Sequence, residues 1–480
     1  MKFNALNRML FICLSIFIVF SCDDEPVERP NTDIDGDTII NALDNCAGVI
    51  NTDQLDTDND GFGDVCDDDD DNDGILDEND NCPLTANPDQ EDGDNDGLGD
   101  VCDDNTIQPQ FPCVNGLSNG YPCDGFDLMS EISVEELGGP GAEGNDSWGW
   151  TDPETGKEYA LIGTTTSAAF VDVSAPSNPI FLGRLPTATE NSLWRDIKTY
   201  NNHAFIVSEA PGHGMQVFDL TRLRNVTNPP ETFTADATYI GFGKAHNIVI
   251  NEDSGFAYAV GTDTFSGGPH FINIQNPTNP VAAGGYSDDA YSHDAQVVTY
   301  NGPDTDHTGK EILIGSNENE VVIVDVTDKA LPTQISTINY SNIGYTHQGW
   351  FTEDMEYFLL GDEVDEINFG VNSRTLVFDF TDLDNPIFHM EYLGPTGAID
   401  HNGYIIGNTF YVANYTAGLR AVDITNIASG TMVESGSFDT YIPDNSTSFH
   451  GAWNIYPFFA SGNIIVSDIE GGMLIVKPSN

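Results

Sequence analysis

The sequence is poor in basic residues. Its 480 residues include 15 Lys and Arg against 78 Asp and Glu, which gives a formal net charge of −63 at pH 7. A chain with this balance repels phosphate backbones and anionic lipid headgroups. The composition therefore excludes nucleic acid as a partner and excludes membrane attachment through surface charge.

Long apolar runs are also missing. The longest, residues 9–20, is about a dozen residues, which is too short to span a bilayer. It follows Lys2 and Arg8, so that a basic stretch leads into a short apolar one. This order is typical of a secretory signal rather than of a membrane helix.

The apolar run ends in Val19-Phe20-Ser21-Cys22. This ending resembles a bacterial lipoprotein signal. The resemblance implies that residues 1–21 are removed, that Cys22 carries the lipid, and that residues 22–32 form a linker. The acidic residues after Cys22 resemble surface-export signals, so an outer-membrane or cell-surface location is expected. Ordinary secretion with cleavage nearby is the alternative.

Motifs of nucleophilic and nucleotide chemistry are missing as well. No Gly-x-Ser-x-Gly elbow occurs beside a helical segment, and no glycine-rich turn has phosphate-loop spacing. Function therefore has to be sought in clusters of carboxylates and histidines.

The excess of carboxylates is concentrated near the N-terminus. Residues 23–104 contain 30 carboxylates and one basic residue, Arg29. The stretch repeats with a period of 36 residues, since Asp44-Asn45-Cys46 recurs as Asp80-Asn81-Cys82 and Gly63-Asp64-Val65-Cys66 recurs as Gly99-Asp100-Val101-Cys102. A fixed period of this kind indicates a repeat architecture.

Each period contains loops of the form Asp-x-Asp-x-Asp-Gly-x-x-Asp-x-x-Asp. Carboxylates at alternate positions of a tight loop converge on one ion, and Ca²⁺ takes six to eight oxygen ligands. Thr38 replaces the glycine in the first loop, which makes that loop the weakest of the four. The predicted calcium ligands are Asp33, Asp35, Asp37, Asn41 and Asp44; Asp56, Asp58, Asp60, Asp64 and Asp67; Asp69, Asp71, Asp73, Asp77 and Asp80; and Asp92, Asp94, Asp96, Asp100 and Asp103.

These loops closely resemble thrombospondin type 3 repeats, over about residues 33–105. No amphipathic helices flank them, which argues against paired EF-hands. A disordered acidic linker is the alternative, although disorder does not require Gly, Asp and Cys in fixed register.

Cysteine usage fits an exported chain. Without Cys13 in the signal and Cys22 at the lipid, six cysteines remain, an even number. The simplest pairs are Cys46–Cys66, Cys82–Cys102 and Cys113–Cys123, and the sequence alone leaves other pairings open.

From residue 111 to the C-terminus the chain predicts an all-β domain. Short β-branched and aromatic runs alternate with Gly, Pro and Asn, and no long helical period is visible. One strand type recurs with a terminal acid, as in Phe170-Val171-Asp172, Val322-Ile323-Val324-Asp325 and Val377-Phe378-Asp379. Seven copies of roughly 50 residues predict a seven-bladed β-propeller, with residues 126–134 completing the last blade. A two-sheet sandwich is the alternative.

The Val-Ile-Val-Asp strands, the opening Pro112-Cys113-Val114-Asn115-Gly116, and His-Asn or His-Asp before a strand resemble the LVIVD-repeat proteins of the "choice-of-anchor B" group. The resemblance covers about residues 112–478. It implies a propeller and an envelope location, and it implies no established activity.

One marked residue opens the first strand of each copy. The markers are Trp148, Arg195, His246, His293, His347, His401 and His450. Equivalent positions in seven blades gather at one mouth of the channel, so the five histidines are expected to form a ring there. The ring can be structural, as repeated residues often are, or it can bind a polar ligand or a transition metal.

Two functions follow as expectations. The first is a calcium-binding cell-surface lipoprotein whose propeller binds a surface protein or a glycan, for adhesion or assembly. The second is a metal-dependent enzyme, a hydrolase or an oxidase, that uses the histidine ring. The first is the expectation we prefer, and the metal content of the purified domain from Phe111 onward discriminates between the two.

Overall fold

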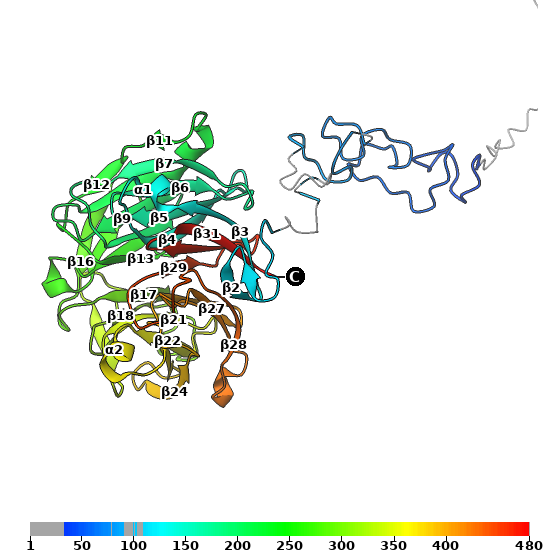
Figure 1. Ribbon diagram of the computed structural model, residues 1–480. Helices are drawn as coiled ribbons and strands as arrows, with labels where there is room; N and C mark the ends of the chain where they lie inside the picture. The colour runs from blue at the N-terminus through cyan, green and yellow to red at the C-terminus, as the bar shows by residue number, and fades with distance from the viewer. Residues whose placement is uncertain (1–32, 78, 91–98, 100, 103–108, 480) are drawn as a thin grey trace, which may run out of the picture. The chain divides into compact units, whose positions relative to one another are not determined.

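The computed structural model describes residues 33–479, except 78, 91–98, 100 and 103–108. The chain divides into two compact units, residues 1–104 and 105–480, and each is described by itself (Figure 1). Within the described residues, no helix has the length and apolar character needed to cross a membrane. The predicted signal peptide and Cys22 lie outside the described residues.

The first unit is irregular, and its described residues form turns and bends without a helix or strand. Its two disulfides, Cys46–Cys66 and Cys82–Cys102, are those predicted. The 36-residue period reappears in the hydrogen bonds, because the backbone N–H groups of Asn45 and Asn81 donate to the side chains of Gln54 and Gln90, each at 3.0 Å. The cysteines and these amides, rather than an apolar core, therefore connect the loops.

The second unit is the predicted seven-bladed β-propeller (Figure 1). Each blade is an antiparallel sheet, and in most blades the four strands follow one another in sequence from the axis outwards. The first three blades consist of β4 (Gly144–Thr151), β5 (Glu158–Thr164), β6 (Ser167–Asp172) and β7 (Ile180–Pro186); β8 (Arg195–Tyr200), β9 (His203–Ser208), β10 (Met215–Asp219) and β12 (Ala237–Tyr239); and β13 (Asn247–Asn251), β14 (Phe256–Val260), β15 (His270–Asn273) and β16 (Val281–Gly285).

The remaining four blades have the same construction. They consist of β17 (Asp294–Thr299), β18 (Glu311–Ser316), β19 (Val321–Asp325) and β20 (Thr333–Ile338); β21 (Thr346–Phe351), β22 (Tyr357–Asp362), β23 (Arg374–Asp379) and β24 (Ile387–Leu393); β25 (Gly403–Ile406), β26 (Thr409–Ala413), β27 (Leu419–Asp423) and β28 (Val433–Phe438); and β29 (Ala452–Tyr456), β30 (Ile464–Asp468), β31 (Gly472–Pro478) and β3 (Phe126–Ser133).

Short elements decorate the blades. The strand β11 (Glu231–Thr232) runs parallel to β7, and β2 (Tyr121–Asp124) with β1 (Leu117–Ser118) extends the sixth blade. The helices are α1 (Val134–Gly138), α2 (Asp365–Phe369), η1 (Leu220–Asn225), η2 (Phe265–Gly267) and η3 (Ile427–Ser429). The third predicted disulfide, Cys113–Cys123, joins β2 to the segment before it.

The third strand of each blade is apolar on both faces because neighbouring blades cover both. In β19, Val322 and Val324 pack toward the blade before, whereas Val321 and Ile323 pack toward the blade after. Successive strand residues point to opposite faces, so a strand buried between two sheets reads as a continuous apolar run.

The acid that ends this strand stabilises a turn. Asp325 Oδ1 accepts the backbone N–H of Thr327 at 3.0 Å, and Asp423 Oδ1 accepts that of Thr425 at 2.8 Å. Such bonds replace the ladder partner that the backbone loses where the strand ends. The repeated aspartate is therefore a turn residue.

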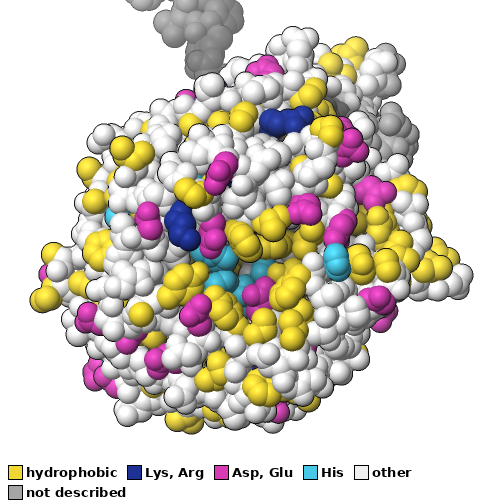
Figure 2. All heavy atoms as spheres, turned by 60° about the vertical axis from the view of Figure 1, so that its left-hand side comes forward, with side chains coloured by type: hydrophobic (Ala, Val, Ile, Leu, Met, Phe, Trp, Pro, Cys, Tyr) yellow, Lys and Arg dark blue, Asp and Glu magenta, His cyan; other side chains and the backbone are white. Residues whose placement is uncertain are grey.

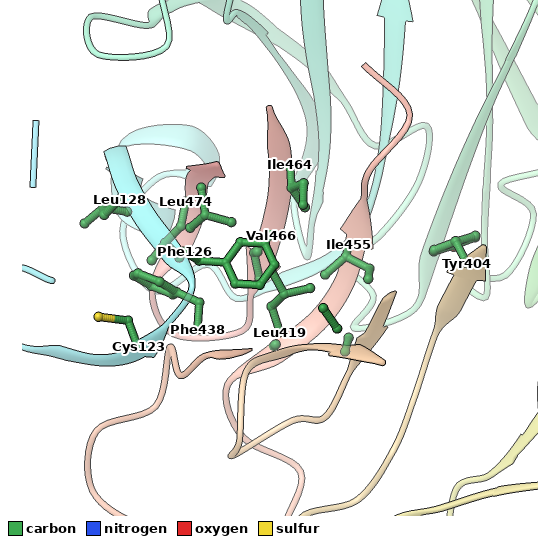
Figure 3. Close-up of a cluster of buried hydrophobic side chains, with 14 residues drawn as sticks. Cys123, Phe126, Leu128, Tyr404, Leu419, Phe438, Ile455, Ile464, Val466 and Leu474 are labelled. Atoms are coloured by element: carbon green, nitrogen blue, oxygen red, sulfur yellow. The ribbon is translucent and has the colours of Figure 1, made fainter. Parts of the chain in front are cut away.

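The N-terminal strand closes the ring, as predicted. Antiparallel pairing joins β3 to β31 from Phe126 opposite Pro478 to Ser133 opposite Gly472. Phe126 and Leu128 are buried with Phe438 and Leu474 in the cluster between the last two blades (Figure 3). Without β3, the edge of β31 and this cluster would face water.

Deleting residues 126–134 should therefore destabilise the propeller, whereas deleting residues 23–104 should leave it intact. The first deletion removes a full strand pairing and exposes an edge, so we expect aggregation or a fall of several degrees in Tm. Equal melting temperatures for the two deletions would contradict ring closure by β3.

A substitution in β3 tests the same point without changing chain length. Leu128→Ala removes a fully buried side chain and should lower the free energy of unfolding by about 2–5 kcal/mol. The matched control, Leu393→Ala, lies on the outer strand β24 and is 51% exposed, so its effect should stay within about 0.5 kcal/mol.

Candidate functional site

Four histidines from neighbouring blades stand side by side at one mouth of the central channel. The ring centroids of His246 and His293 are 4.1 Å apart, and those of His293–His347 and His347–His401 are 4.4 Å apart. Each of these residues lies within two residues of the start of an innermost strand. The predicted grouping of His246, His293, His347 and His401 is therefore present.

The structure places His450 and Trp148 away from this ring. Trp453 takes the ring position in the seventh blade, with its centroid 5.0 Å from that of His401. His450 lies three residues earlier, half-exposed, with Nδ1 2.5 Å from Glu470 Oε1. The strand β21 has the same register shift, between Thr346 and Gln348, as the seventh blade has between Ala452 and Asn454. Trp453 is therefore the equivalent of His347, and the predicted marker His450 lies three residues before the ring position.

Trp148 lies further along its strand, beyond a similar register shift between Gly144 and Ser147. It packs edge-on against Tyr404 and Tyr456. It also lines a second cavity of about 380 Å³, together with Lys198, Trp350 and Phe458. Trp148 therefore packs against neighbouring aromatic side chains and also lines a cavity of the channel.

A cavity of about 450 Å³ opens above the four histidines. Figure 2 shows histidine side chains at the bottom of a hollow whose wall carries hydrophobic and acidic side chains. The wall includes Trp194, Phe449 and Trp453, and the acids include Glu143 and Glu470. Among the described residues that line this cavity, none is Lys or Arg.

Glu363 lies against two of the histidines, in the turn after β22. Its Oε2 is 3.6 Å from His347 Nε2, and its Oε1 is 3.5 Å from His401 Nε2. The hydroxyl of Tyr415 donates to Glu363 Oε1 at 2.9 Å. The strand pattern of the sequence does not identify this carboxylate as a neighbour of the histidines, because it does not fix side-chain direction in a turn.

Burial sets the protonation of this cluster. It lowers the pKa of His293 and His347 far below the ordinary value, and it lowers the pKa of His401 to about 3. Burial raises the pKa of Glu363 to about 7. The imidazoles of His293, His347 and His401 are therefore neutral, with nitrogen lone pairs available to a ligand or a cation.

A second ring of polar side chains lies deeper in the channel. It consists of Asp146, Asp196, Asn247, Asp294, Gln348 and Asn402. Lys198 Nζ is 2.5 Å from Asp196 Oδ1 and 3.5 Å from Asp146 Oδ2, so a buried ammonium offsets the carboxylates. These groups separate the histidine cavity from the second cavity.

The first three predicted calcium loops fold alike. The leading aspartate of each loop accepts backbone N–H groups across the loop: Asp33 from Gly36 and Thr38, Asp56 from Gly61, and Asp69 from Gly74. The first, third and fifth positions bring their carboxylate oxygens within 4.8 Å of one another in each loop. The fourth loop, Asp92, Asp94, Asp96, Asp100 and Asp103, lies outside the described residues.

The remaining predicted ligands hold the loops together. Asn41, Asp64 and Asp77 each accept the backbone N–H of the second loop residue, at 2.8–3.1 Å. Asp44 and Asp80 accept from Cys46 and Cys82, and Asp67 accepts from Asp68 and Asp69.

The loops fit calcium because buried oxygens are left without partners. Carboxylate oxygens without a hydrogen-bond partner include Asp35 Oδ2, Asp56 Oδ1, Asp58 Oδ2, Asp69 Oδ1, Asp71 Oδ2 and Asp80 Oδ2. Burial, together with the neighbouring carboxylates, raises the pKa of Asp71. A hard divalent cation satisfies such oxygens and removes their mutual repulsion.

Comparisons with known proteins agree with both repeat types. The thrombospondin type 3 repeat matches residues 22–54 and 55–90, and the LVIVD repeat matches residues 157–187, 309–339 and 404–440. The chain therefore carries both repeats, and thrombospondin type 3 repeats generally bind calcium. With the disulfides, they suggest an extracellular protein. A comparison with curated proteins gives no match.

Solved structures that resemble the chain are propellers of low identity. They include a protein from Lactobacillus plantarum (14% identity, 68% of this chain and 87% of that one, TM-score 0.46) and hydrazine synthase from Kuenenia stuttgartiensis (11%, 67% and 92%, TM-score 0.47). The periplasmic gluconolactonase of Pseudomonas aeruginosa is similar at 14%, 61% and 86%, with a TM-score of 0.41. At these values the likeness says nothing about what this chain binds.

Removing calcium should unfold the first unit. Crowded carboxylates without an apolar core repel one another unless cations neutralise them. The hydrodynamic radius of a fragment of residues 23–104 should rise with chelator and return at calcium concentrations of about 10⁻⁴–10⁻³ M. A radius and circular dichroism spectrum indifferent to chelator would contradict calcium-dependent folding.

A matched pair of substitutions separates ligation from charge. Asp71→Asn removes a loop carboxylate and should weaken one calcium site about tenfold or more in a calorimetric titration. Asp68→Asn removes the same charge at an exposed position outside the ligand pattern, and its titration should match that of the parent protein. Equal losses would mean that general charge, not the loop, binds calcium.

Proposed function

We propose that this chain is an exported, lipid-anchored calcium-binding surface protein whose propeller binds the end of a neutral glycan in the histidine-floored cavity. One observation carries the binding function: the 450 Å³ cavity at the channel mouth combines aromatic walls with carboxylates. Sites for small ligands are concave, of about 300–1,000 Å³, with a few polar groups among apolar ones. A folded partner protein would not enter such a cavity.

The chemistry of the wall favours a neutral sugar. Trp194 and Phe449 are 42% and 46% exposed, so their ring faces are accessible for stacking on a sugar ring. Glu143 and Glu470 supply acceptors for hydroxyl groups. Because the described lining has no Lys or Arg, an anionic sugar would lack a counter-charge.

The order of the chain supports surface attachment. The predicted lipid site, Cys22, comes first, the calcium repeats follow, and the propeller comes last. Calcium-loaded repeats with two disulfides would act as a spacer between anchor and binding domain. Such an arrangement suits adhesion or assembly at the cell surface.

A metal-dependent hydrolase or oxidase is the second candidate. It is favoured by one observation, the cluster of neutral histidines with Glu363. The metal content and activity of residues 111–480 separate it from a binding protein without catalysis.

Trp194→Ala should lower glycan binding about tenfold, since exposed aromatic anchors often supply more than 1 kcal/mol of binding free energy. The measurement is binding of the full-length protein to an array of neutral oligosaccharides, followed by titration of the best one. Phe388→Ala is the control, because Phe388 is 47% exposed on the outer strand β24, remote from the cavity lining.

Binding that survives Trp194→Ala, or that falls equally in Phe388→Ala, would contradict a glycan site in this cavity. Binding of anionic oligosaccharides alone would contradict the neutral-sugar assignment.

A further inference from the structure

Three blades bring their histidines to one carboxylate at the floor of the cavity. His293 precedes β17, His347 lies in β21, and His401 precedes β25, so each comes from a different sheet. Ligand atoms of His293, His347 and Glu363 lie within 4.8 Å of one another. His401 Nε2 joins the same carboxylate at 3.5 Å.

The distances between these ligand atoms can be compared with those between the ligand atoms of a bound zinc ion. In a tetrahedral zinc site with bonds of about 2.0–2.1 Å, neighbouring ligand atoms lie about 3.3 Å apart. The distances from Glu363 to His347 and His401 are 3.6 Å and 3.5 Å. These two contacts use different oxygens of Glu363, Oε2 and Oε1, and the ligand atom of His293 lies within 4.8 Å of those of His347 and Glu363, so the side chains would have to close in by up to about 1.5 Å around a metal ion.

The other nitrogen atoms of two histidines are already oriented. His401 Nδ1 is 2.5 Å from the backbone oxygen of Trp453, and His293 Nδ1 is 3.4 Å from that of His347. Donation to a carbonyl places the proton on Nδ1 and leaves Nε2 free as a ligand. Metal-binding histidines commonly have such outer partners.

A purely structural role for the histidines explains this arrangement less well than metal binding does. A structural histidine is expected to make hydrogen bonds through its ring nitrogens, yet buried His347 Nδ1 has no partner. His293 and His401 each contact a backbone oxygen of the next blade, but the three imidazoles also lie against one another and against the carboxylate of Glu363. A buried imidazole nitrogen without a partner is costly, and carboxylate and imidazole groups packed together are satisfied when they share a cation.

We propose that a divalent transition metal, of the kind that imidazole ligands prefer, binds at His293, His347, His401 and Glu363. Imidazole suits zinc, copper, iron and nickel, and one carboxylate is compatible with zinc or iron. The site goes beyond the proposed glycan function and is distinct from the calcium loops, whose ligands are oxygens. Because these residues line the cavity, the metal faces the space in which a ligand would bind.

A second group of one histidine and two carboxylates differs from the proposed site because a basic side chain lies beside it. His307 Nε2 is 3.1 Å from Asp384 Oδ2 and 3.8 Å from Asp304 Oδ2. Its Nδ1, however, is 3.3 Å from the ammonium nitrogen of Lys310. A fixed positive charge beside the histidine disfavours a second cation, and none of the described residues lining the main cavity is Lys or Arg.

The test uses full-length protein stripped of metal and then saturated with calcium. Titration with CoCl₂ should give one equivalent of visible absorption typical of cobalt bound by histidine nitrogen, and ZnCl₂ should displace it. His347→Gln and Glu363→Gln should weaken cobalt binding about a hundredfold or more, since even outer partners of ligands contribute 10–100-fold. Their melting temperatures without metal should stay near that of the parent.

His450→Ala is the matched control, because His450 lines the same cavity but pairs with Glu470 outside the cluster. It should bind cobalt like the parent. The proposal is overturned if the parent shows no such band, or if His450→Ala loses it as fully as His347→Gln.

A second measurement covers variants that fail to fold. Zinc-edge X-ray absorption of the parent protein should show about three imidazole ligands and one oxygen, whereas an oxygen-only shell would overturn the proposal. Loss of glycan binding in Trp194→Ala leaves the metal unaffected, so failures of the two proposals are distinguishable.

Discussion

The antiparallel pairing of β3 with β31 is the interaction on which the propeller and its candidate site depend. Two segments far apart in the chain, Phe126–Ser133 and Gly472–Pro478, complete one sheet. That pairing holds the first and last blades together, so that all seven innermost strands converge. His293, His347 and His401 belong to three consecutive blades and contact one another where the innermost strands converge.

Much of the fold could be predicted from the sequence because each repeated signal has one physical cause. Runs such as Val321–Asp325 are apolar since they lie between two sheets, and their aspartates recur since each stabilises the same turn. Cys46–Cys66 and Cys82–Cys102 follow from identical 36-residue periods. These signals depend on the order of residues within a repeat and on the spacing between repeats, and both can be read directly from the sequence.

Which residues form the site could not be predicted from the spacing of residues in the sequence alone. His450 lies three residues before the ring position, which Trp453 occupies, and Trp148 pairs with Leu161 as Trp350 pairs with Leu359, three residues beyond His347. Glu363 reaches His347 and His401 from a turn, where side-chain direction follows from tertiary packing. A histidine or tryptophan close to the start of an innermost strand therefore does not by itself identify the residue that faces the channel.

The proposed metal site depends on the convergence of the innermost strands, which brings three imidazoles and one carboxylate together. Anomalous diffraction at the zinc absorption edge, from crystals grown with zinc and calcium, locates a bound ion without ambiguity. We expect a peak within coordination distance of His293, His347, His401 and Glu363, at about 2.0–2.2 Å from the ligand atoms. A map with no peak there, or with zinc only at His450 and Glu470, would contradict it.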